Sequence, residues 1–400
     1  MVLQADLDRE IEDIKKKLNI LNRDSLHDLE AKDKKILEKL DKDLKLEELK
    51  QKRFEREKEK KELKYLNKKE DKENGLIKQK YGIDILKIIA DIEKEVSQII
   101  VGQREIVRGV IRAILCNGHV LVEGVPGIAK TLLIKSIATV MGCQMNRIQF
   151  TVDLLPTDIT GINSYDPKKG FEVIKGPIFA NFIIADEINR SPPKTQSALL
   201  EAMEEKHVTI AKESYKLPEP FFVMATENPL ENSGVYTLPE AKIDRFLFKL
   251  NMEYPNLQEE LFILDRNVTL KKFEDYHLRS VLSPHLIIRL QDITKKIYIS
   301  DEIKKYIVQI VEETRKKDTD FAKYIAYGAS PRASIAIYIA SKAEALMNGR
   351  DYVIPSDVAK VVYPILRHRI ILNYEAEAEK IKTEDIIGKI LNKVKTKEIK

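Results

Sequence analysis

Residues 119–136, HVLVEGVPGIAKTLLIKS, join an apolar strand pattern to an apolar helix pattern through a turn rich in glycine and proline. A strand that leads through such a turn into a helix opening on Lys130 and Thr131 is the arrangement of a phosphate-binding loop. Backbone N–H groups at the start of the helix bind phosphate oxygens, and the helix dipole adds to the attraction. Ala129 departs from the usual pattern, which has glycine before the lysine. Taken alone, the stretch is also compatible with a Gly/Pro turn before a buried helix.

A nucleotide bound at this loop needs a cation at its phosphates and a protein ligand for magnesium. Lys130 would place its ammonium group at the β- and γ-phosphates, and the Thr131 hydroxyl would ligate Mg²⁺. The stretch therefore predicts ATP and Mg²⁺ as cofactors. The residues expected to line the nucleotide are Gly124, Val125, Pro126, Gly127, Ile128, Ala129, Lys130, Thr131 and Leu132.

Two further apolar strands end in polar side chains that suit the same chemistry. The first, in FIIADEINR, ends in Asp186 and Glu187, and carboxylates at the end of a buried strand are costly unless they meet charged partners. We expect Asp186 to hold magnesium, directly or through water, and Glu187 to act as the general base on the attacking water. The second, in FFVMATENP, ends at Asn228, whose amide can hydrogen-bond that water or the γ-phosphate. Alone, this asparagine is more often a turn former before proline.

Two arginines stand out because they lie in apolar, sharply punctuated stretches. Arg245 sits between an aspartate and a phenylalanine in LPEAKIDRF, and Arg332 follows a proline in GASPRAS. A single arginine is usually a surface residue or an ion-pair partner. Phosphoryl transfer, however, requires cations where negative charge develops on the γ-phosphate. We therefore include both arginines among the candidate catalytic residues, with Glu187 and Asn228.

Composition excludes several other classes of protein. The chain has 400 residues, 69 basic against 64 acidic, and a net charge of +5, which is too small an excess to indicate a nucleic-acid partner. Two cysteines, Cys116 and Cys143, exclude a disulfide framework and are expected to be buried, reduced thiols. The six histidines form no HExxH or other zinc pattern. The polar N-terminus and the lack of an apolar run of about 18 residues predict a cytoplasmic protein without a membrane span.

Three segments differ in their pattern. Residues 1–80 are rich in both charges, with leucine and isoleucine at coiled-coil spacing, and predict a helical extension that self-associates or binds a partner; a solvated, frayed charged helix is the alternative. Residues 81–254 alternate strand and helix patterns and include two expected hairpins, at 161–174 and 207–218. Residues 255–400 are helical in pattern, with VIPSD opening a late helix.

The order of these elements resembles the AAA+ ATPases, and the MoxR family in particular. The resemblance rests on strings that lie between residues 99 and 377, and that family regularly has alanine at the position of Ala129. The matching strings are IVGQ, HVLVEGVPGIAKT, DLLPTDITG, GPIFANFIIADEINRSPPKTQSALLEAMEE, LPEPFFVMATENP, YTLPEAKIDRF, GASPRAS, GRDYVIPSDV and ILRHRI. The resemblance implies an α/β P-loop domain with a parallel sheet, flanking helices and two hairpin inserts, followed by an all-α lid. The first 80 residues depart from the family, so nothing about them follows from it.

The resemblance also assigns roles to residues. Lys130, Thr131, Asp186 and Glu187 resemble the two Walker motifs, Asn228 resembles the first sensor, and Val101 and Gly102 resemble the segment that lines the adenine. Arg332 resembles the second sensor, which reaches the γ-phosphate from the lid of the same subunit. Arg245 resembles the arginine finger that a subunit presents to its neighbour's nucleotide. Arg190 is a possible second cation of this kind, although an ion pair within the subunit is the stronger expectation.

Together these features predict an ATPase that assembles into a ring, with six subunits as the expectation for the class. The resemblance implies chaperone-like work on a client protein complex, often with a von Willebrand factor A-domain partner. The alternatives are a nucleic-acid motor, which the balanced charge disfavours, and a nucleotide-bound scaffold that works through its helical extension. Neither nucleic acid nor membrane is an expected partner.

Overall fold

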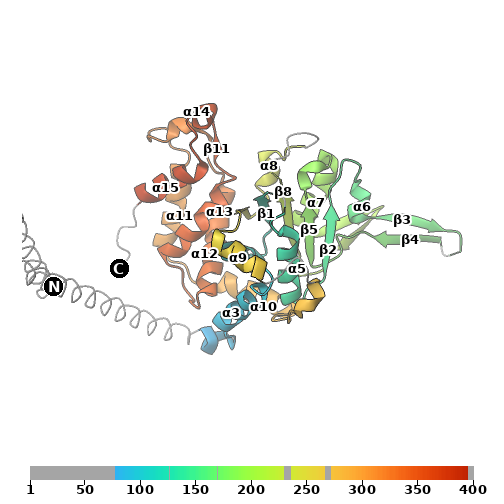
Figure 1. Cartoon of the computed structure of the whole chain (residues 1–400). Coiled ribbons are helices and arrows are strands. Elements are labelled where there is room, and N and C mark those ends of the chain that lie inside the picture. Colours follow the sequence, from blue (N-terminus) through green and yellow to red (C-terminus); the bar gives the residue numbers. More distant parts are fainter. Residues whose placement is uncertain (1–76, 126, 169, 229–235, 266–271, 395–400) are drawn as a thin grey trace, which may run out of the picture. The chain divides into compact units, whose positions relative to one another are not determined.

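The computed structural model describes residues 77–125, 127–168, 170–228, 236–265 and 272–394. Apart from residues 77–80, the predicted helical extension lies outside this range, as does Pro126. The described residues belong to one structural unit, which Figure 1 shows as a sheet with flanking helices beside a bundle of helices.

The sheet has five parallel strands in the order β2-β5-β8-β1-β9. The strands are β1 Val120–Gly124, β2 Met145–Gln149, β5 Phe182–Asp186, β8 Phe222–Glu227 and β9 Phe248–Met252. The central strands β5 and β8 are buried almost throughout, as expected for parallel strands covered on both faces. Because the strands are parallel, all their carboxyl ends lie at one edge of the sheet. This is the edge at which open α/β sheets bind ligands.

Alternate residues of the strands enter two separate cores, since successive side chains of a strand point to opposite faces. Val120 and Val122 of β1 pack in a core with α3 Ile85–Val96, α4 Arg104–Leu115 and α5 Lys130–Val140. The residue between them, Leu121, faces the other core with α7 Pro193–Glu205. The first core continues into the helices of the lid.

Both predicted hairpins are confirmed. Strand β3 Gly161–Asp166 pairs with β4 Gly170–Lys175, and β6 His207–Ile210 pairs with β7 Glu213–Lys216. The short helix α6 Pro156–Thr160 leads into the first hairpin, which extends away from the sheet (Figure 1). Gly161 has φ +105°, and a Cβ there would lie 2.3 Å from the carbonyl oxygen of Ile174, so the base of this hairpin requires glycine.

The C-terminal part is the predicted helical lid. Its main helices are α10 Pro284–Lys296, α11 Asp301–Glu313, α12 Pro331–Met347, α13 Pro355–Leu366 and α15 Thr383–Lys393. It also contains a two-stranded sheet that the sequence pattern did not predict, β10 Ile325–Tyr327 with β11 Ile371–Leu372. The remaining short elements are α8 Glu240–Ile243, α9 Leu257–Asp265, α14 Tyr374–Ala378, and the 3-10 helices Ile188–Arg190, Phe273–Tyr276 and Ala322–Tyr324.

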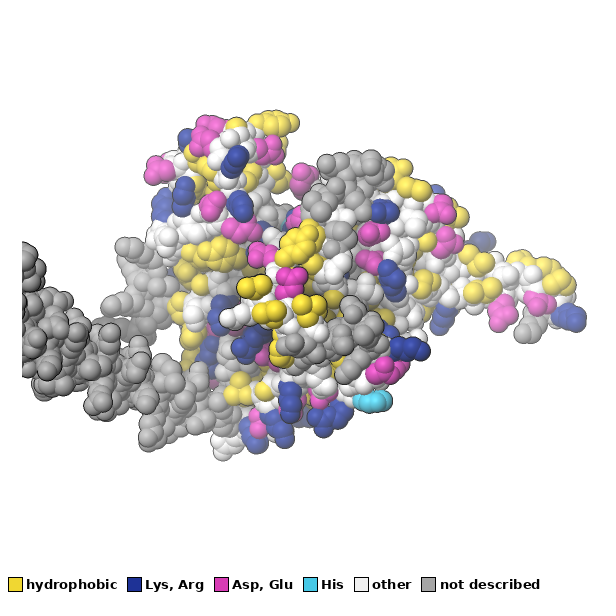
Figure 2. Space-filling model, in the orientation of Figure 1, with side chains coloured by type: hydrophobic (Ala, Val, Ile, Leu, Met, Phe, Trp, Pro, Cys, Tyr) yellow, Lys and Arg dark blue, Asp and Glu magenta, His cyan; other side chains and the backbone are white. Residues whose placement is uncertain are grey.

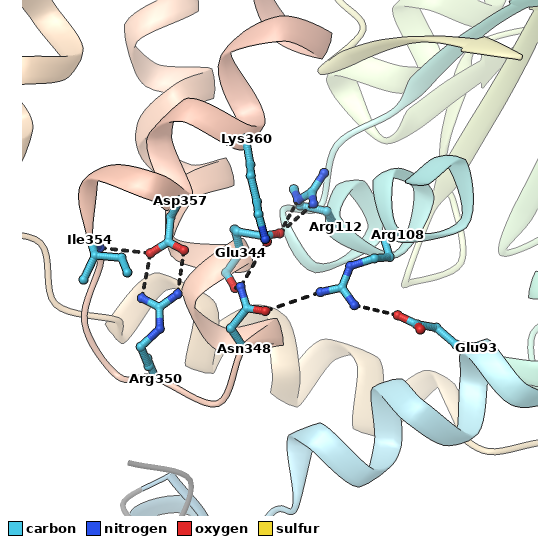
Figure 3. A network of polar contacts seen from close by, with 9 residues as sticks. All are labelled: Glu93, Arg108, Arg112, Glu344, Asn348, Arg350, Ile354, Asp357 and Lys360. Atoms are coloured by element: carbon cyan, nitrogen blue, oxygen red, sulfur yellow. Dashed lines mark hydrogen bonds and ion pairs between the residues drawn. The ribbon is translucent and has the colours of Figure 1, made fainter. Parts of the chain in front are cut away.

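A buried ion pair joins the lid to helix α4, which precedes the sheet in the chain. The Arg112 guanidinium donates to Glu344 Oε2 from Nε at 2.9 Å and from a terminal nitrogen at 2.6 Å. Figure 3 shows Asn348 and Lys360 at the same carboxylate, which has no exposed surface. Burial raises the pKa of Glu344, but the Arg112 charge and these hydrogen bonds outweigh it and lower the pKa to about 2.

Two sequence expectations about the bulk of the chain can be compared with the structure. Cys116 and Cys143 are free thiols, as expected, but both are only partly buried, whereas buried thiols were expected. Among the described residues, no helix is long and apolar enough to cross a membrane.

Candidate functional site

The turn between β1 and α5 has the backbone of a phosphate-binding loop. Gly127 and Ala129 both have positive φ, +83° and +64°, and Val125 lies in the same turn. Ala129 is the N-cap of α5, and no side chain caps the helix there. A helix N-terminus of this kind favours a bound anion. Gly124, the last residue of β1, packs closely against the Ile128 side chain. A Cβ at Gly124 would lie 2.7 Å from Ile128 Cδ1.

Lys130 lies between the ends of two neighbouring strands. Its Nζ donates to the carbonyl oxygen of Gly124 at 2.6 Å and to that of Glu227 at 3.4 Å. Asn228, which is buried, follows Glu227 directly. Burial raises the pKa of the Glu227 carboxyl. The lysine ammonium and the asparagine thus occupy the same edge of the sheet, next to the loop.

Asp186 is the centre of a network at the end of β5. Its Oδ2 lies 3.5 Å from Thr131 Oγ1, and its Oδ1 accepts a hydrogen bond from Thr226 Oγ1 at 2.6 Å. Arg147 from β2 donates to Oδ2 from two nitrogens, at 3.1 and 2.6 Å. These hydrogen bonds fix the orientation of the Asp186 carboxylate, which faces Thr131 in the first turn of α5.

The neighbouring Glu187 is held by polar partners at both its backbone and its side chain. Its backbone N–H donates to Thr226 Oγ1 at 2.9 Å, and its φ is +57°. Gln149 Nε2 donates to Glu187 Oε2 at 2.8 Å, and Arg190 Nε lies 3.1 Å from the same oxygen. The ion pair expected for Arg190 within the subunit is confirmed, with Glu187 as the partner.

The chemistry of this donor set fits magnesium. A hydroxyl and a carboxylate oxygen at the end of a phosphate-binding loop are hard oxygen ligands of the kind that Mg²⁺ prefers. Thr131 and Asp186 would hold the ion beside bound phosphates. Arg147 donates to the Asp186 oxygen that also faces Thr131, so its guanidinium would compete with an ion held there.

A cavity of about 450 Å³ opens beside the loop, where a nucleotide base and ribose would be accommodated. Five residues predicted from the sequence line it: Val101, Gly127, Ile128, Ala129 and Leu132. Tyr254 and Pro255 close it from the segment after β9, and the sequence pattern gave no sign of their role. Gly102 borders an adjacent cavity of about 570 Å³. It has φ +72°, and a Cβ there would meet the Glu259 carboxylate at 2.7 Å.

Known proteins share this architecture over most of the chain. The family described as "ATPase family associated with various cellular activities (AAA)" matches residues 119–248, and the AAA lid domain matches residues 317–390. Chaperone MoxR1 of Mycobacterium tuberculosis is 47% identical over 306 residues, which cover 75% of this chain and 80% of that protein. The chain belongs to the MoxR family of AAA+ ATPases.

Two further proteins are similar to this chain over most of its length. The uncharacterised Bacillus subtilis protein YeaC is 44% identical over 316 residues, 79% of this chain and 97% of its own length. The crystal structure of a candidate ATPase from Cytophaga hutchinsonii has 44% identity and a TM-score of 0.71, covering 84% of this chain and 98% of that one.

In this MoxR-family ATPase, Arg245 and Arg332 lie together but away from the phosphate loop of their own subunit. Arg245 pairs with Glu204 at 3.2 Å, and Arg332 pairs with Glu204 at 2.8 Å and with Asp244 at 3.7 Å. Within the described part of the chain, neither arginine pairs with Asp186 or Glu187. Arg332 was expected beside the γ-phosphate of the same subunit, and this role stays a prediction; the ion-pair partners of Arg332 are Glu204 and Asp244.

The neighbours of these arginines place them at the opposite edge of the sheet. Glu204 is near the end of α7, and the carbonyl of the preceding Met203 lies 3.2 Å from His119 Nε2, just before β1. Leu247, just before β9, donates its N–H to the His119 carbonyl at 2.8 Å. The arginine pair is therefore at the amino ends of the strands, whereas Lys130 and Asp186 are at the carboxyl ends.

Several polar residues of this MoxR-family site were missed by sequence reasoning. Arg147, Gln149 and Thr226 fix the two acidic residues, and Glu204 holds both arginines. Arg147 and Gln149, which alternate with the apolar residues of RIQF at the end of β2, were an available signal. Gln149 is the register partner of Asp186. Glu204 gave no such signal, since it lies in a helix end rich in glutamate.

Proposed function

We propose that this MoxR-family ATPase hydrolyses ATP to ADP and phosphate at the loop formed by residues 124–132. The observation that carries the proposal is the convergence of Lys130, Thr131 and Asp186 at one edge of the sheet, with Glu187 adjoining. Magnesium would be held by Thr131 and Asp186, and it would supply neutralising charge at the phosphates. The cavity lined by Val101 and Leu132 would take the base.

The chain's own residues divide the work as follows. The loop N–H groups and Lys130 bind and orient the phosphates, and Asn228 positions the attacking water. Glu187 accepts a proton from that water as general base. In the structure Glu187 is engaged by Gln149 and Arg190, so productive binding requires its carboxylate to turn from these partners toward the water.

The position of the two arginines supports the proposal of a ring of subunits. A five-residue strand spans roughly 16 Å, so Arg245 and Arg332 at its amino end are too distant to contact phosphates at its carboxyl end. Phosphoryl transfer still needs cations on the developing charge. We propose that both arginines serve the nucleotide of the neighbouring subunit, in a ring that is hexameric by the expectation for the class. Residues 81–254 would form the nucleotide-binding domain and residues 255–400 the lid.

We further propose that the ring remodels a client protein through the β3–β4 hairpin. Four of its large hydrophobic side chains are exposed: Ile162, Tyr165, Phe171 and Ile174. The Tyr165 and Phe171 rings lie across the strands with centroids 5.1 Å apart, and Figure 2 shows hydrophobic side chains along this projection. Such an apolar surface on a projecting element is typical of a protein-binding site. The name of the Mycobacterium tuberculosis relative includes "chaperone", which agrees with this role.

A von Willebrand factor A-domain partner, recruitment by residues 1–80, and location in the cytoplasm remain predictions. Pull-downs with full-length and truncated protein would test the recruitment. Equal recovery of partners by the two forms would contradict it.

The Glu187→Gln variant tests the proposed hydrolysis. Loss of the general base should lower kcat at least about 100-fold while ATP binding is retained. Phosphate release and equilibrium binding of a fluorescent ATP analogue measure the two properties separately. Glu201→Gln, an exposed residue of α7, is the matched control and should have wild-type activity. Wild-type hydrolysis by Glu187→Gln would refute the assigned base and favour a scaffold role.

A further inference from the structure

Arg369 is a buried arginine just beyond the end of α13, and every donor of its guanidinium is used. It is 8% exposed, and its five N–H groups have five partners within hydrogen-bond distance. The partners are Asp244 Oδ1 at 2.7 Å and the carbonyl oxygens of Ile365 at 2.7 Å, Phe246 at 2.8 Å, Asp244 at 3.1 Å and Leu247 at 3.2 Å. Four of these five bonds go to the segment 244–247.

The segment that Arg369 binds carries Arg245. It joins α8 to β9, and on both sides of Arg245 its backbone carbonyls are held by the same guanidinium, at Asp244 and at Phe246. The Asp244 side chain receives Arg369 at one oxygen and lies 3.7 Å from Arg332 through the other. Arg369 thus binds the backbone on both sides of Arg245 and the carboxylate that lies near Arg332. It does so at the amino ends of the strands, at the edge opposite the nucleotide loop.

We propose that Arg369 is a positioning residue that sets Arg245 and Arg332 for the neighbouring subunit's nucleotide. This inference rests on the proposed action of the two arginines across the ring. Arg369 comes from the lid and Arg245 from the sheet domain, so the contact makes the turn at 244–247 follow the lid. A displacement of the lid is then transmitted to both cations together.

The role requires the planar fork of arginine. A guanidinium presents donors in fixed directions and can bind a carboxylate and several carbonyls at once. A lysine ammonium is a single point of charge with three donors, and it cannot reach Asp244, Phe246 and Leu247 simultaneously. Arg369→Lys therefore keeps the buried charge but removes most of the hydrogen bonds that hold the turn at 244–247.

A purely structural role for Arg369 predicts different behaviour from a positioning role. A structural defect weakens the subunit that carries it, including its own nucleotide site. A positioning defect leaves that subunit able to bind and hydrolyse ATP when its neighbour supplies intact arginines. The two roles therefore separate in mixed rings.

The experiment uses full-length protein and measures kcat and KM for ATP hydrolysis by Arg369→Lys. We expect kcat to fall at least about 10-fold, the loss anticipated for misplaced catalytic cations, with KM within twofold of wild type. Arg367→Lys is the matched control, because Arg367 donates to the Lys249 carbonyl and pairs with Glu384 but does not bind segment 244–247. It should retain wild-type kcat.

Mixing then tests the action across the interface. Lys130→Ala subunits are expected not to hydrolyse ATP but to offer intact arginines, so adding them to Arg369→Lys subunits should restore activity. If activity is not restored, the positioning role is overturned. If Arg245→Ala loses activity while Arg369→Lys keeps it, the inference fails and the proposed function stands. If Arg245→Ala itself keeps full activity, both fall.

Asp244→Asn provides a second variant in case Arg369→Lys does not fold. It preserves the side-chain volume and the backbone carbonyls that Arg369 binds, but removes the charge between Arg369 and Arg332. The same selective loss of kcat, restored by Lys130→Ala subunits, is expected. Unchanged kcat in a folded Asp244→Asn ring would contradict the proposal.

Discussion

Arg245 and Arg332 bind the two oxygens of one carboxylate, Glu204, at 3.2 and 2.8 Å. The two residues are far apart in the chain and come from different parts of it, a turn before β9 and the start of α12. A shared counter-ion holds two like charges next to each other, which is otherwise unfavourable. The shared carboxylate thus holds two guanidinium groups together at one site, as the proposed action on a phosphoryl group requires.

The first prediction concerns these two arginines. Arg245→Ala and Arg332→Ala should each lower kcat at least about 100-fold, since catalytic arginines of this kind contribute that much or more. The affinity of the mutated subunit for ATP should remain within about twofold, because in the proposed ring the lost cation would serve the neighbour. Fluorescent-nucleotide titration and phosphate release measure the two effects.

The outcome for Arg332→Ala separates action within the subunit from action across the interface. Lys130→Ala subunits should rescue hydrolysis by Arg332→Ala subunits in mixed rings. Failure of rescue, together with weaker ATP binding by the isolated variant, would return Arg332 to the role within its own subunit.

The second prediction concerns Ala129, whose φ of +64° is disfavoured for a residue with a Cβ by roughly 1 kcal/mol. Ala129→Gly relieves this strain but adds freedom to the unfolded chain, so the free energy of unfolding should change by less than about 1 kcal/mol. Nucleotide binding should be retained. Ala129→Val should destabilise the loop, because a β-branched side chain tolerates this conformation least.

A matched control shows whether the position decides the effect. Ala138→Gly makes the same substitution inside α5, where glycine costs about 1 kcal/mol relative to alanine. Urea unfolding should therefore show a clear loss for Ala138→Gly and little for Ala129→Gly. Equal losses would mean that the conformation of Ala129 is not strained.

The comparison of sequence and structure shows which kind of feature a local pattern reveals. Strand ends such as Asp186 and Asn228, and the turn before Lys130, are determined by short-range periodicity and were predicted at the right positions. Both hairpins were also predicted, because alternation and turn residues are local properties. The sequence alone did not reveal side chains that meet only through tertiary packing. Arg147 reaches Asp186 across neighbouring strands, and Glu204 reaches Arg332 across 128 residues.

The ion pairs of Arg332 with Glu204 and Asp244 were not predicted for the same reason. The sequence puts this arginine at the start of a lid helix, but it does not say on which side of the sheet that helix docks. That depends on the packing of α12 against α4 and α13, and on the ion pair of Arg112 with Glu344. The string therefore locates Arg332 at the start of α12, while the subunit whose nucleotide it would serve is a matter for the mixed-ring experiment.

The third prediction is a pH dependence of stability that arises from His119. Its Nδ1 accepts a hydrogen bond from the Val223 N–H at 3.0 Å, so a proton there would face another donor. Burial lowers the pKa of His119 from 6.5 to about 4. The hydrogen bond to the Met203 carbonyl raises the pKa, but it offsets only part of the effect of burial. Because the folded state resists protonation, the free energy of unfolding should fall as the pH drops from about 6.5 to 4, by up to about 3 kcal/mol.

The His119→Gln variant should flatten the dependence in this window, as measured by urea unfolding at a series of pH values. His285→Gln, at an exposed position of α10, is the control and should keep the wild-type slope. A slope that is unchanged in His119→Gln would assign the pH dependence to other groups.

The last prediction concerns the buried pair that ties the lid to α4. Arg112→Met leaves the Glu344 carboxylate with Asn348 and Lys360 alone, and breaking a buried pair from one side costs about 3 to 5 kcal/mol. The double variant Arg112→Met/Glu344→Leu should recover much of that loss, since no buried charge remains unpaired. Urea unfolding measures both.

Arg104→Ala is the control, because it removes a largely exposed partner of Glu93 and should cost less than about 1 kcal/mol. If Arg112→Met cost no more than Arg104→Ala, the pair would not be what holds α12, with Arg332 at its start, against the sheet domain.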